Sequence, residues 1–533
     1  MADNEGKPRS VAEVIKSSVK VPITGFVIFF SIFATIGGFL FGYDIGIIGG
    51  VTNMRPFRIS MGLPPNSTEG EGEDLASAIG IIVSSFSLGC MVGALSAGWL
   101  SDVFGRKMTV LVGSTIFTIG GVFQGAAIYL WMMIVGRVAA GLGVGIMSMV
   151  VPLFNAEISP KELRGRLVSL QQLSITFGIM ISFLVNLAVE GVEIGWRISL
   201  GLQSVFSIIL VIGMLMLPES PRWLVKNGET GKALSVLQRL RAGAHGQNAN
   251  VAQEELDEIV DSIEAERAIG EGTWNEVFCA PDSAKRVVIG CGCQFFQQFS
   301  GINVVMYYSP IIFDHVGVPP LISTAVVGVI NFLSTFIAIY IIDKVGRKFL
   351  MLIGAIGMVI SLFFAGALIY AVDVSQNVGV GIVIVVLVCL YVNSFAYSWG
   401  PCAWVITSEI FPLRLRGKAV SITTLTNWIG VFVVAQITPL LLQPNILNVQ
   451  GMFILMGVFC TAAFFFTWLL VPETKGVSLE AMGQLFKRSS WFEITRPMAY
   501  MREEFAAYLC CRTPQRPVSI HKPARPEQAT AAV

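Results

Sequence analysis

Long apolar segments recur along the whole chain, and they constrain the fold more than any other feature of the sequence. Each has at least about 18 residues, which is enough for a helix to cross a bilayer. Twelve can be counted, at approximately 24–50, 77–100, 108–128, 131–153, 166–189, 196–217, 286–312, 321–342, 349–371, 378–402, 418–441 and 449–471. Only 13% of the 533 residues are charged, about half the usual share in a soluble protein. The sequence therefore predicts an all-α polytopic protein with twelve helices in a lipid bilayer.

The sequence shows no signature of a catalytic or cofactor-binding site. It has no P-loop, no nucleophile elbow and no cluster of metal ligands. We therefore expect no enzymatic activity, no cofactor, no bound metal and no ATP-driven pumping. The net charge of +1 gives no reason to expect a nucleic-acid partner.

Lysine and arginine are distributed unevenly among the connections between the apolar segments. The short even-numbered connections are basic, whereas the odd-numbered ones hold few basic residues. Because cytosolic loops carry an excess of these residues, both termini and the long 218–285 loop are predicted to be cytosolic. The sequon that begins at Asn66 lies in the first connection, which this topology places outside the cell. Asn66 is therefore a candidate glycosylation site.

The two parts of the chain repeat the same motifs in the same order. The first part contains GWLSDVFGRK, AEISPKELRGR and LPESPRW, and the second contains YIIDKVGRK, SEIFPLRLRGK and VPETKG. This repeat predicts two six-helix halves, 23–217 and 286–471, joined by the 218–285 loop with short amphipathic helices. Residues 1–22 are predicted to form a cytosolic segment, and residues 472–533 a largely disordered cytosolic tail.

Acidic residues accompany the arginines of these repeated motifs. The expected ion pairs are Asp102 with Arg106, Glu157 with Arg164, Asp343 with Arg347, and Glu409 with Arg414 or Arg416. Such pairs can form when the cytosolic side is closed and separate when it opens, which would make them an inner gate. The alternative is that the basic residues only anchor the cytosolic helix ends. The acidic partners, repeated at the same place in each half, favour the gate.

Amide side chains interrupt several of the predicted membrane helices. They are Gln297, Gln298 and Asn303 in the seventh helix, Gln171 and Gln172 in the fifth, Asn331 in the eighth and Asn427 in the eleventh. An unpaired amide in hydrocarbon is costly, so each must face a partner or a polar cavity. Gly301 is expected to loosen the seventh helix and bring Gln298 and Asn303 toward one cavity.

An aromatic ring accompanies these amides in the tenth helix. Trp404 follows the sequence WGP at 399–401, where glycine and proline are expected to break the helix. Amides and an aromatic face suit a neutral ligand that is rich in hydroxyl groups. The alternative is that each amide only joins two helices. For the set as a whole, a binding site is favoured.

Six motifs of the chain resemble those of a known family. In chain order they are FGYD, GRVAAGLGVG, PESPRW, QQFSGIN, DKVGRK and PETKG. Together they resemble the sugar porter family of the major facilitator superfamily over about residues 25–480, and the chain is most similar to fungal monosaccharide (hexose) transporters. The resemblance implies two parallel halves that hold the substrate between them near the bilayer midplane.

The resemblance also implies roles for individual residues. The implied sugar ligands are Gln172, Gln297, Gln298, Asn303, Asn331, Trp404 and Asn427. Tyr307 and Tyr308 match the aromatic pair that the family uses as an outer gate. Ile179 departs from bacterial xylose–proton symporters, which have a second glutamine at this position, and this difference favours glucose as the substrate.

A carboxylate, Asp44, lies inside the first apolar segment, in FGYDIGIIGG. An ionisable residue within the membrane is by default a candidate functional residue, and Arg137 is its expected partner. In the resembling symporters the matching pair couples transport to protons. The alternative is a static ion pair, because yeast facilitators resemble this chain at Asp44 and do not couple to protons. Coupling is slightly favoured.

These observations lead to one expected function and two alternatives. The expectation is a monosaccharide transporter of the plasma membrane that carries a hexose, with glucose as the expected substrate, by alternating access in symport with protons. One alternative is a facilitative uniporter of the same fold. The other is a sugar sensor that has lost transport.

Overall fold

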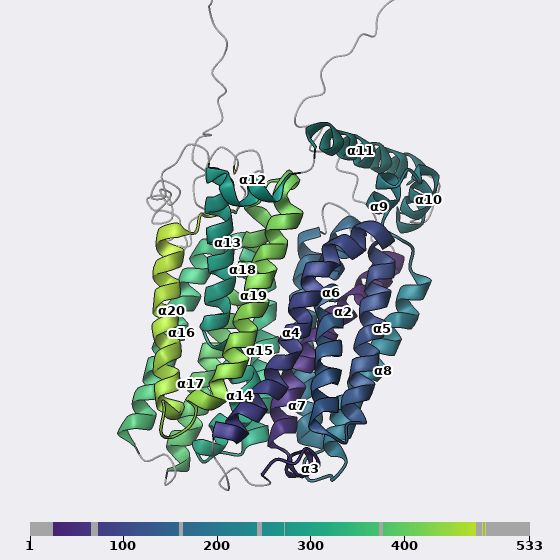
Figure 1. The fold of residues 1–533 in the computed structure, drawn as a ribbon. Helices are drawn as coiled ribbons and strands as arrows, with labels where there is room; N and C mark the ends of the chain where they lie inside the picture. The colour runs from purple at the N-terminus through teal and green to yellow at the C-terminus, as the bar shows by residue number, and fades with distance from the viewer. Residues whose placement is uncertain are drawn as a thin grey trace, which may run out of the picture.

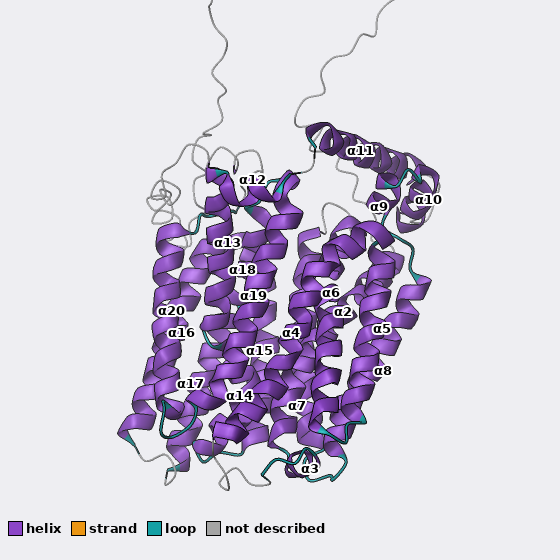
Figure 2. Cartoon of the chain, in the orientation of Figure 1, coloured by secondary structure: helices purple, strands orange, loops and turns teal. Residues whose placement is uncertain are grey.

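The structure is a computed structural model that describes most of the chain between Gly25 and Lys475. The described residues are 25–64, 73–158, 164–241, 248–270, 272–372 and 377–475, together with Met482 and Phe486. Asn66 and most of the predicted cytosolic tail therefore lie outside the described residues. Within these ranges the chain consists of helices and connecting loops, and Figure 2 shows no strand.

The first half is a bundle of long helices, drawn in purple to blue in Figure 1. Its helices are α2 (Gly25–Asn53), α4 (Glu73–Phe104), α5 (Arg106–Gly125), α6 (Leu130–Ile158), α7 (Arg164–Ala188) and α8 (Gly195–Met216). The short helix α3 (Arg55–Ser60) follows α2 at one end of the bundle.

The second half repeats this arrangement beside the first, in teal to yellow. Its helices are α13 (Pro281–Phe299), α14 (Ile302–His315), α15 (Pro320–Val345), α16 (Arg347–Ala371), α17 (Val378–Ala396), α18 (Trp399–Glu409), α19 (Leu413–Leu441) and α20 (Asn448–Leu470). The connecting helices α9 (Pro221–Lys226), α10 (Thr230–Arg241), α11 (Asn248–Ile269) and α12 (Trp274–Cys279) lie at the end opposite α3. We call this end the connector end.

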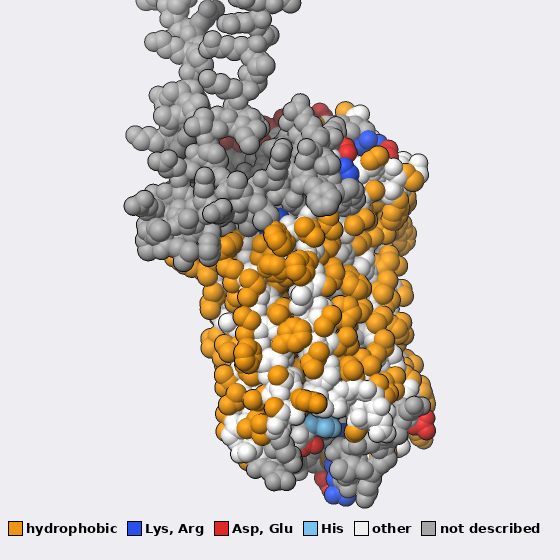
Figure 3. Space-filling view, turned by 90° about the vertical axis from the view of Figure 1, so that its left-hand side faces the viewer, with side chains coloured by type: hydrophobic (Ala, Val, Ile, Leu, Met, Phe, Trp, Pro, Cys, Tyr) orange, Lys and Arg blue, Asp and Glu red, His pale blue; other side chains and the backbone are white. Residues whose placement is uncertain are grey.

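The apolar segments of the sequence correspond to the long helices. Eleven helical segments of the described residues are long and apolar enough to cross a membrane. The remaining segment is the broken pair α13 and α14, whose 19 and 14 residues follow one another through the bundle. Apolar side chains cover the face of the bundle seen in Figure 3, and charged side chains gather toward its ends. This pattern is what a bilayer requires of a protein surface.

Glycines allow α4 and α6 to approach each other closely. A Cβ on Gly141 of α6 would lie 1.9 Å from the carbonyl oxygen of Phe86 on α4, and one on Gly145 would lie 2.3 Å from that of Cys90. Small residues at helix interfaces bring backbones into contact in this way, since lipid supplies no hydrophobic drive for association. The sequence GRVAAGLGVG is therefore the packing surface that places α6 against α4.

Two helices are interrupted in the second half. Gly301 separates α13 from α14 and has φ +91°, a left-handed conformation that glycine adopts readily. The break in the tenth helix lies at Tyr397 and Ser398, slightly before the predicted WGP. Pro401 instead lies in the first turn of α18, where a missing backbone N–H costs no hydrogen bond.

Candidate functional site

An amide network lies where the two helix breaks meet. Gln297 of α13 donates from Nε2 to the carbonyl oxygens of Trp399 and Gly400 at the start of α18, both at 3.0 Å. Asn427 of α19 donates from Nδ2 to Gln297 Oε1 at 2.8 Å and to Gln294 Oε1 at 2.7 Å. Gln297 is therefore the centre of a network that joins α13, α18 and α19.

The break at Gly301 adds two more amides to this network. Asn303 Nδ2 of α14 donates to Gln298 Oε1, and Gln298 Nε2 donates to Gln297 Oε1 at 3.3 Å. Gln297, Gln298 and Asn303 are each at most 6% exposed. As expected from the sequence, the left-handed glycine places Gln298 and Asn303 on the same side of the broken helix.

Gln294 belongs to this network, although sequence reasoning missed it. Its side chain is fully buried, and its Nε2 has no hydrogen-bond partner among the described residues. A buried amide donor without an acceptor is costly, so the site has an unused donor next to Asn427. The sequence could have revealed Gln294 through its position, one helical turn before Gln297.

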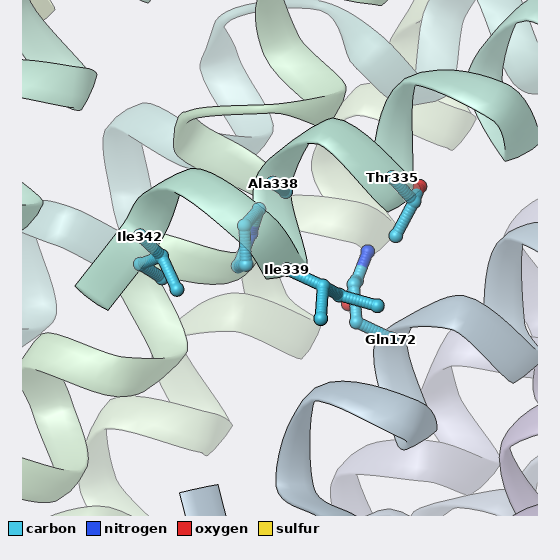
Figure 4. A pocket seen from close by; sticks show the side chains of 6 residues that line it. Gln172, Thr335, Ala338, Ile339 and Ile342 are labelled. Atoms are coloured by element: carbon cyan, nitrogen blue, oxygen red, sulfur yellow. The ribbon is translucent and has the colours of Figure 1, made fainter. Parts of the chain in front are cut away.

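The fifth and eighth helices bring further predicted ligands close to the break at α18. Gln172 of α7 lines a small space with Thr335, Ala338, Ile339 and Ile342 of α15 and with Pro401, and its side chain extends between the two helices (Figure 4). A Cβ on Gly400 would lie 3.6 Å from Gln172 Nε2. Asn331 is buried on α15, one turn before Thr335, and Trp404 is partly exposed one turn after Gly400. Gln172 of the first half therefore lies beside the start of α18, where Gln297 of the second half is bound.

A second tryptophan, Trp428, borders the network and was also missed. It follows Asn427 on α19 and is fully buried. Its ring lies 5.2 Å from that of Phe41 on α2 and 6.4 Å from that of Phe86 on α4, measured between centroids. Trp428 thus connects the amide-bearing half to the other half through aromatic contacts.

The predicted outer-gate tyrosines lie where the two halves pack together. Tyr308 donates its hydroxyl to the carbonyl oxygen of Ala435 on α19. A Cβ on Gly49 of α2 would lie 2.2 Å from the carbonyl oxygen of Tyr307 on α14, so the two backbones touch. Both tyrosines are at most 1% exposed. The two halves are therefore closed against each other around α14. This closed contact lies farther from the connector end than the amide network does.

Asp44 and Arg137 form a buried ion pair in the first half. Arg137 Nη1 lies 3.3 Å from Asp44 Oδ2, and both side chains are fully buried. This separation exceeds the roughly 2.7–2.9 Å of a tight charge-assisted hydrogen bond, and Asp44 Oδ2 accepts no hydrogen bond from the described residues. Arg137 also donates from Nη2 to the Val83 carbonyl at 3.3 Å, and its guanidinium carbon lies 5.2 Å from the centre of the Phe86 ring. The cation therefore has three neighbours, of which the carboxylate is one.

The repeated charged motifs build equivalent clusters at the connector end of each half. Arg106 of α5 binds Glu157 of α6 at 2.9 Å and contacts Asp102 of α4 at 3.4 Å. Glu219 accepts the backbone N–H groups of Arg106 and Lys107 at 2.9 and 3.1 Å. Burial raises the pKa of the Glu219 carboxyl, against the opposing effect of these N–H groups. The cluster ties the ends of α4, α5 and α6 to the segment that follows α8.

The second half has the same construction. Arg347 of α16 binds Glu409 of α18 at 3.1 Å. Glu473 accepts the backbone N–H groups of Arg347 and Lys348, both at 3.0 Å. The sequence repeat therefore corresponds to a structural repeat in which one arginine reaches a glutamate on another helix of its own half.

The predicted contact of Asp102 with Arg106 is present, whereas Glu157 and Arg414 have partners other than the predicted ones. Glu157 binds Arg106, whereas the side chains of Arg164 and Asp343 lie outside those that the structure describes. Arg414, predicted to meet Glu409, binds Glu276 of α12 at 3.0 Å. Arg416 donates to the carbonyl oxygen of Phe411 at 3.2 Å. Sequence spacing could not reveal these partners, because they depend on which helix ends the fold brings together.

Comparison with known proteins decides the family. The model of the family described as "Sugar (and other) transporter" matches residues 30–486. The chain belongs to this sugar transporter family.

Relatives of this family resemble the chain over most of its length. A probable glucose transporter of Neurospora crassa is 35% identical over 86% of this chain and 78% of its own. A low-affinity glucose transporter of Saccharomyces cerevisiae is 35% identical over 86% of this chain and 83% of its own. These relatives are transporters and not enzymes, which agrees with the expectation from the sequence.

A solved structure shares the fold. The proton:xylose symporter XylE bound to 6-bromo-6-deoxy-D-glucose has a TM-score of 0.72 and 31% sequence identity, covering 87% of this chain and 100% of its own. It is a protein of the major facilitator superfamily. The predicted fold of two helical halves is thereby confirmed.

Proposed function

We propose that the chain carries a monosaccharide, with glucose as the favoured substrate, across a membrane by alternating access in symport with a proton. The observation that carries this proposal is the amide network at the meeting point of two broken helices. Membrane transporters place substrate sites at such breaks near the midplane, between their two halves. The similar glucose transporters of Neurospora crassa and Saccharomyces cerevisiae support the choice of sugar.

The network suits a sugar because its amides can exchange partners. Gln298, Asn303 and Asn427 now donate to other amides, and the same groups can donate to and accept from hydroxyl groups. A sugar that enters can therefore replace amide–amide hydrogen bonds without leaving buried polar groups unpaired. The ring of Trp404, which is partly exposed, is available for the C–H side of a pyranose.

The ion pair gives the proposed proton coupling its physical basis. A proton on Asp44 would remove the charge that now faces Arg137, while the Val83 carbonyl and the Phe86 ring would still contact the guanidinium. The contact between Asp44 and Arg137 is long enough to be broken without the loss of a tight hydrogen bond. The proton:xylose symporter with the same fold supports this proposal, and a uniporter with a static pair remains the competing function.

The conformation fits one end of an alternating-access cycle. Under the predicted topology the connector end is cytosolic, and the contact of Gly49 with Tyr307 closes the outer side. In this state Arg106–Glu157 and Arg347–Glu409 join helices within each half. We therefore propose that these pairs act as clamps that make each half a rigid body, rather than as a gate that separates when the inner side opens. Location in the plasma membrane and cytosolic termini are part of the same proposal.

The proposed function is tested by uptake of labelled glucose in a cell that lacks its own hexose transporters. Expression of the chain should restore uptake, and a protonophore should abolish accumulation above the external concentration. Equilibration that a protonophore leaves unchanged would identify a uniporter. Absence of any sugar flux from protein that has reached the cell surface would identify a sensor.

A further inference from the structure

Phe86 stands between the ion pair and the amide network. On one side its ring centre lies 5.2 Å from the guanidinium carbon of Arg137. On the other side it lies 6.4 Å from the ring of Trp428. Trp428 follows Asn427, which donates to Gln297 at the centre of the network. One fully buried ring therefore contacts both the cation of the first half and Trp428, the chain neighbour of Asn427, in the second.

The position of Phe86 is fixed by the backbone around it. The Phe86 carbonyl packs directly on Gly141 of α6, where a Cβ would lie 1.9 Å away. Arg137 lies one turn earlier on α6 and donates to the carbonyl of Val83, which lies one turn earlier on α4. The ring and the guanidinium are thus held by two helices whose backbones are in direct contact, whereas Trp428 belongs to the other half.

We infer that Phe86 is a positioning residue that holds the Arg137 cation when Asp44 is protonated and links that state to the sugar site through Trp428. This inference rests on the proposed symport. A cation over an aromatic face is stabilised by the quadrupole of the ring, and more strongly so where water is excluded. When Asp44 carries its charge, the guanidinium is balanced by the carboxylate. When Asp44 is neutral, the ring and the Val83 carbonyl are the neighbours that remain.

The neighbours of Arg137 with Asp44 charged or neutral determine how loss of the Phe86 ring changes the pH dependence of transport. The ring is needed most in the protonated state, so its removal destabilises that state relative to the charged pair. Protonation of Asp44 then requires a higher proton concentration. Cation–π stabilisation of a desolvated pair corresponds to a shift of about one pH unit. The pH of half-maximal sugar accumulation should therefore move by about one unit toward acid.

Other ionisable groups face the pair, and they titrate outside the range of the assay. Cys90 of α4, Tyr43 of α2, and Tyr307 and Tyr308 of α14 are within electrostatic range of Asp44 or Arg137. The ordinary pKa values of cysteine and tyrosine, about 8.5 and about 10, lie above an assay window of about pH 5 to 7.5. A change in the pH profile within this window therefore reports on the Asp44–Arg137 pair.

The test is the pH profile of sugar accumulation by the Phe86→Leu variant of the full chain in proteoliposomes with an imposed proton gradient. Leucine keeps an apolar side chain and removes the aromatic face. The matched control is Phe117→Leu, because Phe117 is also a fully buried phenylalanine of the first half but packs on Gly143, away from Arg137. Sugar counterflow without a proton gradient is measured on both variants, so that loss of transport is distinguished from loss of coupling.

Phe86→Leu should shift the half-maximal pH by about one unit toward acid, and Phe117→Leu should leave it at the wild-type value. If Phe86→Leu does not reconstitute, Phe86→Met, which has a side chain of similar length without a ring, replaces it. A profile for the Phe86 variant that coincides with the wild type would overturn the inference while symport stands. The same shift in both variants would show a structural effect and overturn it too. A wild type without any proton dependence would overturn the proposed symport together with this inference.

Discussion

Replacing Gln297 by alanine removes the centre of the amide network. The substitution deletes the acceptor of Gln298 Nε2, one of the two acceptors of Asn427 Nδ2, and the donor to the carbonyls of Trp399 and Gly400. A buried polar group left without a partner costs about 1–3 kcal/mol. The sugar also loses one hydroxyl partner at the same cost, which corresponds to a loss of affinity of roughly 5-fold to 150-fold.

The matched control is Gln203→Ala. Gln203 is another fully buried glutamine, on α8, and neither of its amide atoms has a hydrogen-bond partner among the described residues. Its replacement therefore removes no hydrogen bond of the proposed site and should leave sugar affinity unchanged. The assay is binding of labelled glucose by purified protein, with thermal unfolding as a check on folding. Wild-type affinity in Gln297→Ala, or equal losses in both variants, would refute the proposed site.

Two further predictions concern the outer contact between the halves and the ion pair at the connector end. Gly49→Val should prevent α2 from closing on α14, because even a Cβ at position 49 would lie 2.2 Å from the carbonyl oxygen of Tyr307. Cysteine labelling of the site from the outside should therefore rise. Unchanged labelling with normal flux would contradict the closed contact. Glu157→Gln should weaken the contact with Arg106, whose two hydrogen bonds to Glu157, of 2.9 and 3.0 Å, form a bidentate pair. The free energy of unfolding should fall by about 1–3 kcal/mol, and sugar affinity should be retained. Loss of affinity at unchanged stability would contradict a clamp within one half.

The membrane helices could be predicted from the sequence because their signal is local. A run of apolar residues long enough to span a bilayer has few other stable structures, and the bounds of most helices follow from where such runs end. The two helix breaks of the second half were harder to predict. Gly301 was identified from its residue type, since glycine adopts the left-handed conformation, whereas the break at Tyr397 and Ser398 has no distinctive residue. Pro401, the obvious candidate, is tolerated in the first turn of the helix that follows.

The site could be predicted only where polar residues stand out against an apolar background. Asp44, Gln297 and Asn303 are conspicuous in helices that otherwise avoid polar groups. Trp428 and Phe86 are not, because an aromatic residue in an apolar helix gives no signal until packing places it beside a cation or an amide.

The partners in ion pairs were the part of the site that was hardest to predict from the sequence. Residues close in sequence on helix ends were expected to pair. Arg106 contacts the expected Asp102, but it also binds Glu157 through the packing of α5 on α6, and Arg414 meets Glu276 through the docking of α12 on α19. Such partners are set by tertiary structure, so spacing along the chain does not determine them.

The central claim is that Asp44 gains and loses a proton in step with sugar movement. The substitution Asp44→Asn keeps nearly the same shape and one acceptor oxygen but cannot titrate. It also leaves Arg137 without its counter-charge, and breaking a buried pair costs roughly 3–5 kcal/mol. Surface expression and thermal stability must therefore be shown to be adequate before transport is compared.

The most direct measurement is sugar accumulation by wild type and Asp44→Asn in proteoliposomes, with a proton gradient imposed from an external pH of about 5–6. The wild type should concentrate glucose above the external level and lose this ability with a protonophore. Asp44→Asn should retain counterflow and downhill flux, and it should never exceed equilibrium. Accumulation by Asp44→Asn that equals the wild type, or a wild type that only equilibrates glucose, would contradict the account and leave Asp44 as the static partner of Arg137.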